Sequence, residues 1–256
     1  MTSLLGRPRA ALAVPALLLL VVAGCTADPG PKAARTAAAS APRATAAPTA
    51  TPSPDPTPTE EPLPEQRLDA GAVAEGAPAT VSGTGAAVVQ VLRQGEFGVV
   101  AHLDCSACTG RVVLSAEERM SAWGEGPAPL TGSYLVDIFK ESDPQQEVVV
   151  RAEGPWTLRF ESWNDLPPVT GVQQGTGAAV LLVGDDAAAV QLDYVPVDAD
   201  DSMTARVFSA VDVTESGNPD TLLLGDDVAF SERVDVRMPG VVVLGTRGSW
   251  TVTPLP

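Results

Sequence analysis

Cys105 and Cys108 are the closely spaced thiols of this chain, with Ser106 and Ala107 between them. Four residues across a turn can bring the two Cα atoms within the range of about 4.4–6.8 Å that a disulfide allows. In a thioredoxin-like motif the first thiol lies at a helix N-terminus, which lowers its pKa, but here residues 109–112 lead into a strand-like run. A zinc site would need two further ligands. The spacing therefore favours a structural disulfide, with redox chemistry and metal binding as alternatives.

Asp198, Asp200 and Asp201 form the densest group of carboxylates in the chain. Alternate carboxylates in a loop can bind Ca²⁺, which takes about six to eight oxygen ligands. This loop supplies three at most, and it lacks the glycine and the distal glutamate of an EF-hand. The pattern favours a solvated acidic turn, with a calcium site as the alternative.

Trp123 and Trp163 lie in segments rich in turn residues, where an exposed indole can stack on a sugar or on a partner. A sugar-binding face normally combines several aromatic rings, and aromatic residues are only 4% of this chain. We therefore expect Trp123 and Trp163 to pack between the two copies, with ligand contact as the alternative. Trp156 and Trp250 follow matching glycines and are expected in the core.

His102 is the single histidine of the chain. The sequence contains no Gly-x-Ser-x-Gly elbow, no His-Glu-x-x-His pair and no P-loop. A pair of carboxylates can act without histidine, but nothing distinguishes one pair among the many acids. We predict no catalytic residue, no resident metal and no cofactor, and we keep an enzyme that uses two carboxylates as the least favoured alternative.

The N-terminal residues suggest where the protein resides. Arg7 and Arg9 precede an uncharged segment, residues 10–22, which is shorter than the roughly 20 apolar residues of a spanning helix. Val22, Ala23, Gly24 and Cys25 follow, and this arrangement resembles the lipobox of bacterial lipoproteins. The resemblance implies cleavage before Cys25 and a lipid such as palmitate on that residue. A plain signal peptide and an uncleaved anchor are the alternatives.

This resemblance also bears on the other two cysteines. An extracytoplasmic location is oxidising, which favours a disulfide between Cys105 and Cys108. The chain has 14 Arg and 2 Lys, a usage similar to that of GC-rich bacteria such as actinobacteria. The protein is thus expected at the extracytoplasmic face of the cell membrane, held there by the lipid on Cys25.

A proline-rich segment follows the proposed lipid site. Ten of residues 26–66 are proline, and the segment has almost no large apolar side chains. Such a composition cannot bury enough surface to offset its ordering entropy, so we expect a disordered tether. Residues 1–66 contain five basic and five acidic side chains, so the net charge of −16 belongs to residues 67–256. That charge disfavours nucleic acid as a partner.

The remainder of the chain repeats itself once. Three segments recur in the same order: residues 83–88 as 175–180, residues 102–104 as 191–193, and residues 154–158 as 248–252, at offsets of 92, 89 and 94. The common spacing predicts a duplication of about 90 residues, which is the size of a small β-sandwich rather than of a solenoid repeat.

Short valine-rich runs, separated by Gly, Pro, Asp and Asn, predict strands in both copies. They cover residues 86–92, 98–104, 111–115, 133–140, 147–152 and 156–161, and then 178–183, 187–195, 204–210, 228–236, 241–245 and 250–253. Residues 116–122 give the one helix-like pattern. The Gly-x-Gly opening and the Gly-x-Trp-Thr ending of each copy resemble small jelly-roll-like sandwiches of exported bacterial proteins.

We therefore expect an all-β protein with two tandem antiparallel β-sandwich domains of jelly-roll-like form. The expected divisions are a signal peptide (1–24), a tether (25–66), the first sandwich (67–163) and the second sandwich (164–256). The expected function is non-catalytic binding or scaffolding in the cell envelope, with a protein or glycan partner. A carbohydrate- or calcium-binding accessory module is the main alternative.

Overall fold

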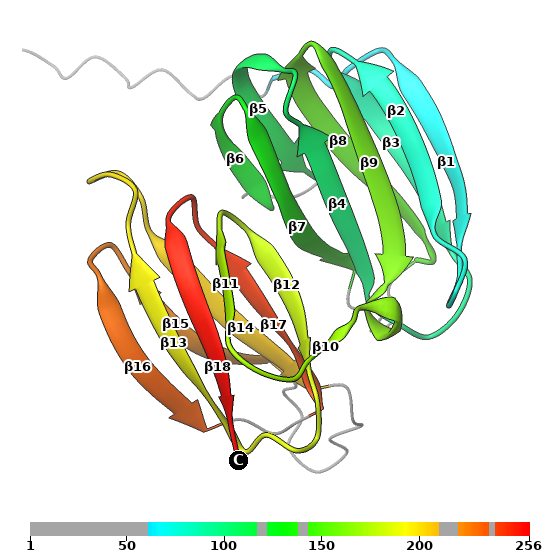
Figure 1. Ribbon diagram of the computed structural model, residues 1–256. Coiled ribbons are helices and arrows are strands. Elements are labelled where there is room, and N and C mark those ends of the chain that lie inside the picture. Colours follow the sequence, from blue (N-terminus) through cyan, green and yellow to red (C-terminus); the bar gives the residue numbers. More distant parts are fainter. Residues whose placement is uncertain (1–60, 117–121, 138–142, 210–219, 236–238) are drawn as a thin grey trace, which may run out of the picture. The chain divides into compact units, whose positions relative to one another are not determined.

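The computed structural model describes residues 61–116, 122–137, 143–209, 220–235 and 239–256 (Figure 1). Within them nearly all regular structure is β-strand, and the one helical element is a 3-10 turn, η1 (Trp163–Asp165). The all-β class is therefore confirmed. Most of the helix-like segment 116–122 lies outside the described residues, as do the expected signal peptide and most of the tether.

The first sandwich has two sheets. Its five-stranded sheet has the order β1-β3-β8-β5-β6, and its four-stranded sheet has the order β2-β9-β4-β7. The strands are β1 (Arg67–Val73), β2 (Ala79–Thr84), β3 (Ala87–Arg93), β4 (Val99–Cys105), β5 (Thr109–Ser115), β6 (Gly124–Pro127), β7 (Leu130–Asp137), β8 (Gln145–Glu153) and β9 (Pro155–Ser162).

The second sandwich repeats this arrangement nine strands later. Its sheets have the orders β10-β12-β17-β14-β15 and β11-β18-β13-β16. The strands are β10 (Pro168–Val169), β11 (Gln173–Thr176), β12 (Ala179–Val183), β13 (Ala189–Val195), β14 (Met203–Ser209), β15 (Asp220–Asp226), β16 (Phe230–Asp235), β17 (Gly240–Gly245) and β18 (Ser249–Leu255). Each strand has a counterpart at the same place in the first sandwich, as a duplication requires.

Each sandwich departs in one place from the expected antiparallel pairing. β1 runs parallel to β3, and β10 runs parallel to β12, whereas the other paired strands are antiparallel. Parallel neighbours need a crossover connection, and here the intervening strand, β2 or β11, lies in the opposite sheet. The chain therefore returns to the first sheet in its original direction.

Each core consists mainly of aliphatic side chains that alternate along the strands. Buried examples are Val89, Val91, Leu103, Leu114 and Leu158 in the first sandwich, and Val190, Leu192, Ala205, Leu244 and Val252 in the second. The residues that alternate with them along each strand point to the outer faces of the sheets. In β4, for example, His102 and Asp104 alternate with buried residues. This alternation explains how a chain poor in aromatic residues builds two cores.

Trp156 closes the first sandwich against two glycines. Its indole lies over Gly83, where an added Cβ would overlap the ring. The indole Nε1–H donates to the carbonyl oxygen of Gly85 at 2.8 Å. Gly85 has a φ of +76°, and its N–H donates to Gly154 at 3.0 Å. The glycines are therefore required by the close approach of the ring and by a left-handed turn.

Trp250 makes the same set of contacts in the second sandwich. It lies over Gly175, and its Nε1–H donates to Gly177 at 2.8 Å. Gly177 also has a φ of +76° and donates to Gly248 at 2.9 Å. The predicted core positions of both tryptophans are confirmed.

The connection after β9 stays with the first sandwich. The amide Nδ2 of Asn164 donates to Glu75 at 2.6 Å, and Asp165 accepts from the N–H of Gly76 at 2.8 Å. Strands of the second sandwich begin only at β10 (Pro168–Val169). The first sandwich therefore extends a few residues beyond the expected division at residue 163.

Candidate functional site

The proposed lipid site, Cys25, lies outside the described residues. Within the described part, no helix combines the length and the apolar character that a membrane crossing requires. The candidate sites within the described residues lie in the turns and on the outer faces of the two sandwiches.

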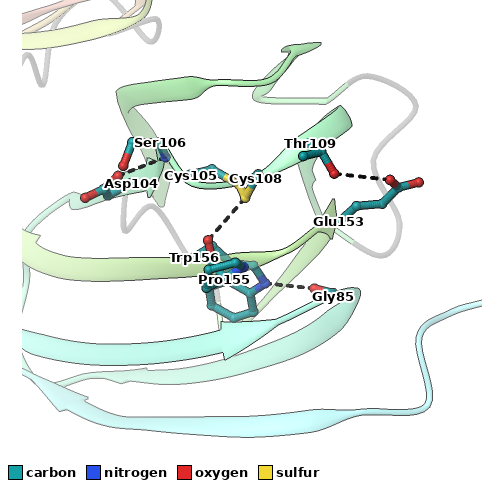
Figure 2. The surroundings of a disulfide bond; sticks show 9 residues. All are labelled: Gly85, Asp104, Cys105, Ser106, Cys108, Thr109, Glu153, Pro155 and Trp156. Carbon is teal, nitrogen blue, oxygen red and sulfur yellow. Dashed lines mark hydrogen bonds between the residues drawn. A yellow bond between two sulfur atoms is a disulfide. The ribbon is translucent and has the colours of Figure 1, made fainter.

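Cys105 and Cys108 form a disulfide across the turn between β4 and β5 (Figure 2). Their Cα atoms are 5.2 Å apart, and the N–H of Cys108 donates to the carbonyl of Cys105 at 3.2 Å. Both residues are buried, and Sγ of Cys108 lies 3.3 Å from the carbonyl oxygen of Pro155. The disulfide thus holds the turn against the start of β9, which is a structural arrangement.

Asp104 and Ser106 fix the exposed side of the same turn (Figure 2). Oδ1 of Asp104 accepts from the N–H of Ser106 at 3.0 Å. Hydrogen bonds from the Ser106 hydroxyl and from its N–H lower the pKa of Asp104. Asp104 is thus a carboxylate at neutral pH, and it orders the turn that the disulfide closes.

Loss of this disulfide is expected to lower the free energy of unfolding by about 2 kcal/mol, because the closed loop is only four residues long. Reduction of the native chain, followed by urea unfolding monitored by far-UV circular dichroism, measures this change without altering a side chain. The double variant Cys105→Ala/Cys108→Ala is the matched control and should be insensitive to the reductant. An unchanged midpoint after complete reduction would contradict the structural role.

A shallow depression of about 580 Å³ lies beside the disulfide turn. Small polar side chains line much of it: Ser82, Thr84, Asp104, Ser106 and Thr157. Trp156 contributes to the wall, but its ring is buried beneath Gly83 and cannot stack on a sugar. The depression therefore gives no support for a glycan site of the stacking kind.

The second sandwich closes the equivalent turn, between β13 and β14, without cysteine. The carboxylate of Asp201 is buried, and its side chain is 2% exposed. It accepts from the N–H of Arg247 at 3.0 Å, from the N–H of Val197 at 3.1 Å and from the hydroxyl of Thr246 at 3.2 Å. A buried carboxylate thus joins this turn to the β17–β18 turn, as the disulfide turn contacts β9 in the first sandwich.

Burial would by itself raise the pKa of Asp201. The N–H donors of Arg247 and Val197, together with the Thr246 hydroxyl, outweigh burial, and the pKa lies below its ordinary value. Asp201 is therefore ionised at neutral pH although it is buried.

Arg247 also binds Asp198 through two nitrogen–oxygen contacts of 2.6 and 3.1 Å. Of the three aspartates considered for calcium, Asp198 and Asp201 are thus occupied by protein donors, and Asp200 is exposed. No group of three or more acidic, histidine or cysteine residues in the described part is arranged to hold a metal ion. The loop is a hydrogen-bonded turn in which Asp198 and Asp200 are exposed, whereas Asp201 is buried rather than solvated.

The two tryptophans considered for ligand contact are both used in packing. Trp163, the first residue of η1, is buried. Its ring lies against Gly98, which leaves room for it because it has no side chain. Trp123 is partly buried against the first core, and its backbone N–H donates to the carbonyl oxygen of Leu114 at 2.8 Å. Trp163 is thus packed within the first sandwich, and Trp123 is partly covered by its core.

His102 lies on the outer face of β4 between two neighbouring strands. Its Nδ1 is 2.7 Å from the Ser133 hydroxyl on β7, and its Nε2 is 2.6 Å from Oε1 of Glu161 on β9. Glu161 is buried, and its other oxygen is 2.5 Å from Nη1 of Arg159. This cluster could not be identified from the sequence, because His102 is 31 residues from Ser133 and 59 residues from Glu161, and they meet only through strand pairing.

A serine hydroxyl, an imidazole and a carboxylate in series can also activate a nucleophile. The second sandwich argues for a structural role instead. There Gln191 takes the place of His102, and its Nε2 donates to the hydroxyl of Ser231 at 3.1 Å on the neighbouring strand β16. A polar pair across these two strands is thus kept without histidine, which is how cross-strand pairs stabilise a sheet.

No protein-family model matches this chain, and a search of curated proteins finds no relative.

Proposed function

We propose that this protein is a lipid-anchored, non-catalytic binding protein at the extracytoplasmic face of the cell membrane. The observation that carries the proposal is the N-terminal pattern, in which a basic start and an uncharged segment end in Ala23, Gly24 and Cys25. One lipid chain gives weak membrane binding, whereas two or more give stable anchoring. Lipid on both the sulfur and the new N-terminus of Cys25 would satisfy that requirement.

The contact between Arg151 and the end of the tether supports this arrangement. Arg151 lies on β8, and its Nη1 donates to Oε1 of Glu61 at 2.9 Å. Its Nη2 donates to the carbonyl of Pro62 at 2.8 Å. Residues 61 and 62, at the end of the proposed tether, therefore contact the first sandwich before β1 begins at Arg67. A spacer between a lipid and a rigid domain suits a protein that binds partners away from the bilayer surface.

The polar clusters of the described residues support binding rather than catalysis. Asp201 and Arg247 fix a turn, and His102 and Glu161 join neighbouring strands. The charge of −16 favours a cationic partner over nucleic acid or an anionic surface. We propose that this partner is a protein of the envelope.

Anchoring predicts that the native chain incorporates labelled palmitate and that Cys25→Ser does not. Intact-mass analysis should place the N-terminus of the native chain at Cys25, whereas Cys25→Ser should retain residues 1–24. The control Cys108→Ser should incorporate label like the native chain, since Cys108 is buried in a disulfide. Palmitate in Cys25→Ser, or a native N-terminus elsewhere, would contradict the proposal.

The binding role is tested in the same preparations. The folded chain is added to whole envelopes, cross-linked and recovered in detergent, and an unfolded chain is treated in the same way as the control. The folded chain should recover more of one partner protein than the unfolded chain does. Equal recovery from folded and unfolded chains would count against a specific partner.

A further inference from the structure

One end of the second sandwich carries exposed valine side chains. Val195, Val197 and Val228 are 56%, 61% and 58% exposed, and they account for three of the five large exposed apolar side chains in the described part. We call these three residues the valine tip. Val195 ends β13 and Val228 precedes β16, and these strands pair through Tyr194 and Phe230. The register therefore places Val195 and Val228 at the same end of the sheet.

The valine tip is carried by two turns that are fixed by hydrogen bonds. The N–H of Val197 donates to the buried carboxylate of Asp201 at 3.1 Å. The N–H of Val228 donates to Oδ1 of Asp226 at 3.2 Å, and the N–H of Asp227 donates to the same oxygen at 2.8 Å. In Figure 1 both connections, after β13 and before β16, lie at one end of the second sandwich. A surface ordered in advance loses less conformational entropy when it binds.

Exposed carboxylates lie next to the valine tip in the sequence. Asp198 and Asp200 follow β13, Asp226 ends β15, and Asp227 lies in the connection before β16. Arg247 contacts the connection after β13, and its guanidinium group is already paired with Asp198. An apolar centre inside a charged rim is the usual construction of a protein-binding surface. The sign of the rim excludes an anionic lipid surface and selects a cationic partner.

We propose that the valine tip and its acidic rim form a docking surface for a basic segment of a partner protein, one that places an aliphatic side chain between lysines or arginines. The aliphatic side chain packs on Val195, Val197 and Val228, and the cations approach Asp200 and Asp227. This inference rests on the proposed binding function and names the chemistry of its partner.

The test uses the full chain in a non-ionic detergent and three short fluorescent peptides. The first has lysines on both sides of a central Leu-Val pair, the second has glutamate in place of lysine, and the third has serine in place of Leu-Val. Fluorescence anisotropy should show binding of the first peptide only, and binding should weaken as salt is added. Equal binding of the first and third peptides, or no binding of the first, would overturn the proposal.

Matched variants locate the surface. Val197→Ser/Val228→Ser should weaken binding of the first peptide by about tenfold, because the apolar centre is lost. Val172→Ser is the control, since Val172 is 58% exposed but lies outside both connections, and it should bind like the native chain. All three sites are exposed, so folding should be preserved, and far-UV circular dichroism verifies this. Equal affinity of the tip variant and the control would overturn the proposal.

A photo-cross-linking amino acid at position 197 of the full chain, in whole envelopes, then identifies the occupant. A basic segment of another protein supports the proposal. A second copy of this chain, or a segment of the same chain, would overturn it. Absence of palmitate on Cys25 would end the anchoring proposal but leave the peptide measurements intact, so the two failures are distinguishable.

Discussion

Replacing Trp156 with alanine should lower the free energy of unfolding by about 3–5 kcal/mol, the range for large aromatic residues removed from a core. The indole is buried and fills the space over Gly83, which has no side chain of its own to occupy that space when the ring is removed. Its loss also leaves the carbonyl of Gly85 without the Nε1–H donor at 2.8 Å. The cavity and the unpaired acceptor therefore both lower the free energy of unfolding.

Urea unfolding monitored by far-UV circular dichroism measures this change without depending on indole fluorescence. Trp156→Phe should lose less, because the phenyl ring refills part of the space but donates no hydrogen bond. Trp250→Ala should cost about as much as Trp156→Ala, since Trp250 makes the equivalent contacts over Gly175 and with Gly177. A Trp156→Ala chain as stable as the native chain would show that this packing contributes little.

The same tryptophans show which parts of the fold the sequence could predict. Residues that touch across the sandwich in both copies left a repeated pattern, because Gly83 and Gly175 must be small wherever a tryptophan lies over them. The repeat therefore predicted two sandwiches and their central strands. Strand order and the parallel pairs could not be predicted, since they depend on which sheet each strand joins.

The strands that sequence reasoning missed are edge strands. β1, β6, β10 and β15 each lie at the edge of a five-stranded sheet, and β2 and β11 each lie at the edge of a four-stranded sheet. β1 and β6 contain Gly, Asp or Glu and bury few side chains, so their composition is that of a turn. β10 is only two residues long. An edge strand pairs on one side only, so the alternation that identifies central strands is not required of it.

Sites were predictable where the chemistry was local. The spacing of Cys105 and Cys108 was sufficient for the disulfide, because both partners belong to one turn. Asp201 could not be distinguished from Asp198 and Asp200, since its partner Arg247 is 46 residues away in sequence. His102 and Glu161 meet only because β4 pairs with β9. Functional surfaces such as the valine tip depend on the same long-range register.

Replacing Asp201 with asparagine should lower the free energy of unfolding at pH 7 by about 2–3 kcal/mol, the range for hydrogen bonds to a charged, buried group. Asparagine keeps the shape of the side chain and one acceptor oxygen, which can still receive the N–H of Arg247. Its NH₂ group would then face the N–H of Val197, which now donates to Oδ2 at 3.1 Å. Two donors would face each other in a buried turn. Asp200→Asn is the matched control and should leave stability unchanged, since Asp200 is exposed.

The dependence of this effect on pH follows from the lowered pKa of Asp201. Its pKa in the folded chain lies below the ordinary value of 3.8, because the N–H donors outweigh burial. The carboxylate therefore stabilises the fold fully above the unfolded pKa, and this contribution disappears as the pH falls through the folded pKa. The difference in stability between the native chain and Asp201→Asn should be constant from neutral pH down to about pH 5 and should shrink below about pH 4. Urea unfolding across this range measures it. A difference that persists unchanged at low pH would show that the acceptor pattern of the side chain, rather than the charge of Asp201, holds the turn that carries the valine tip.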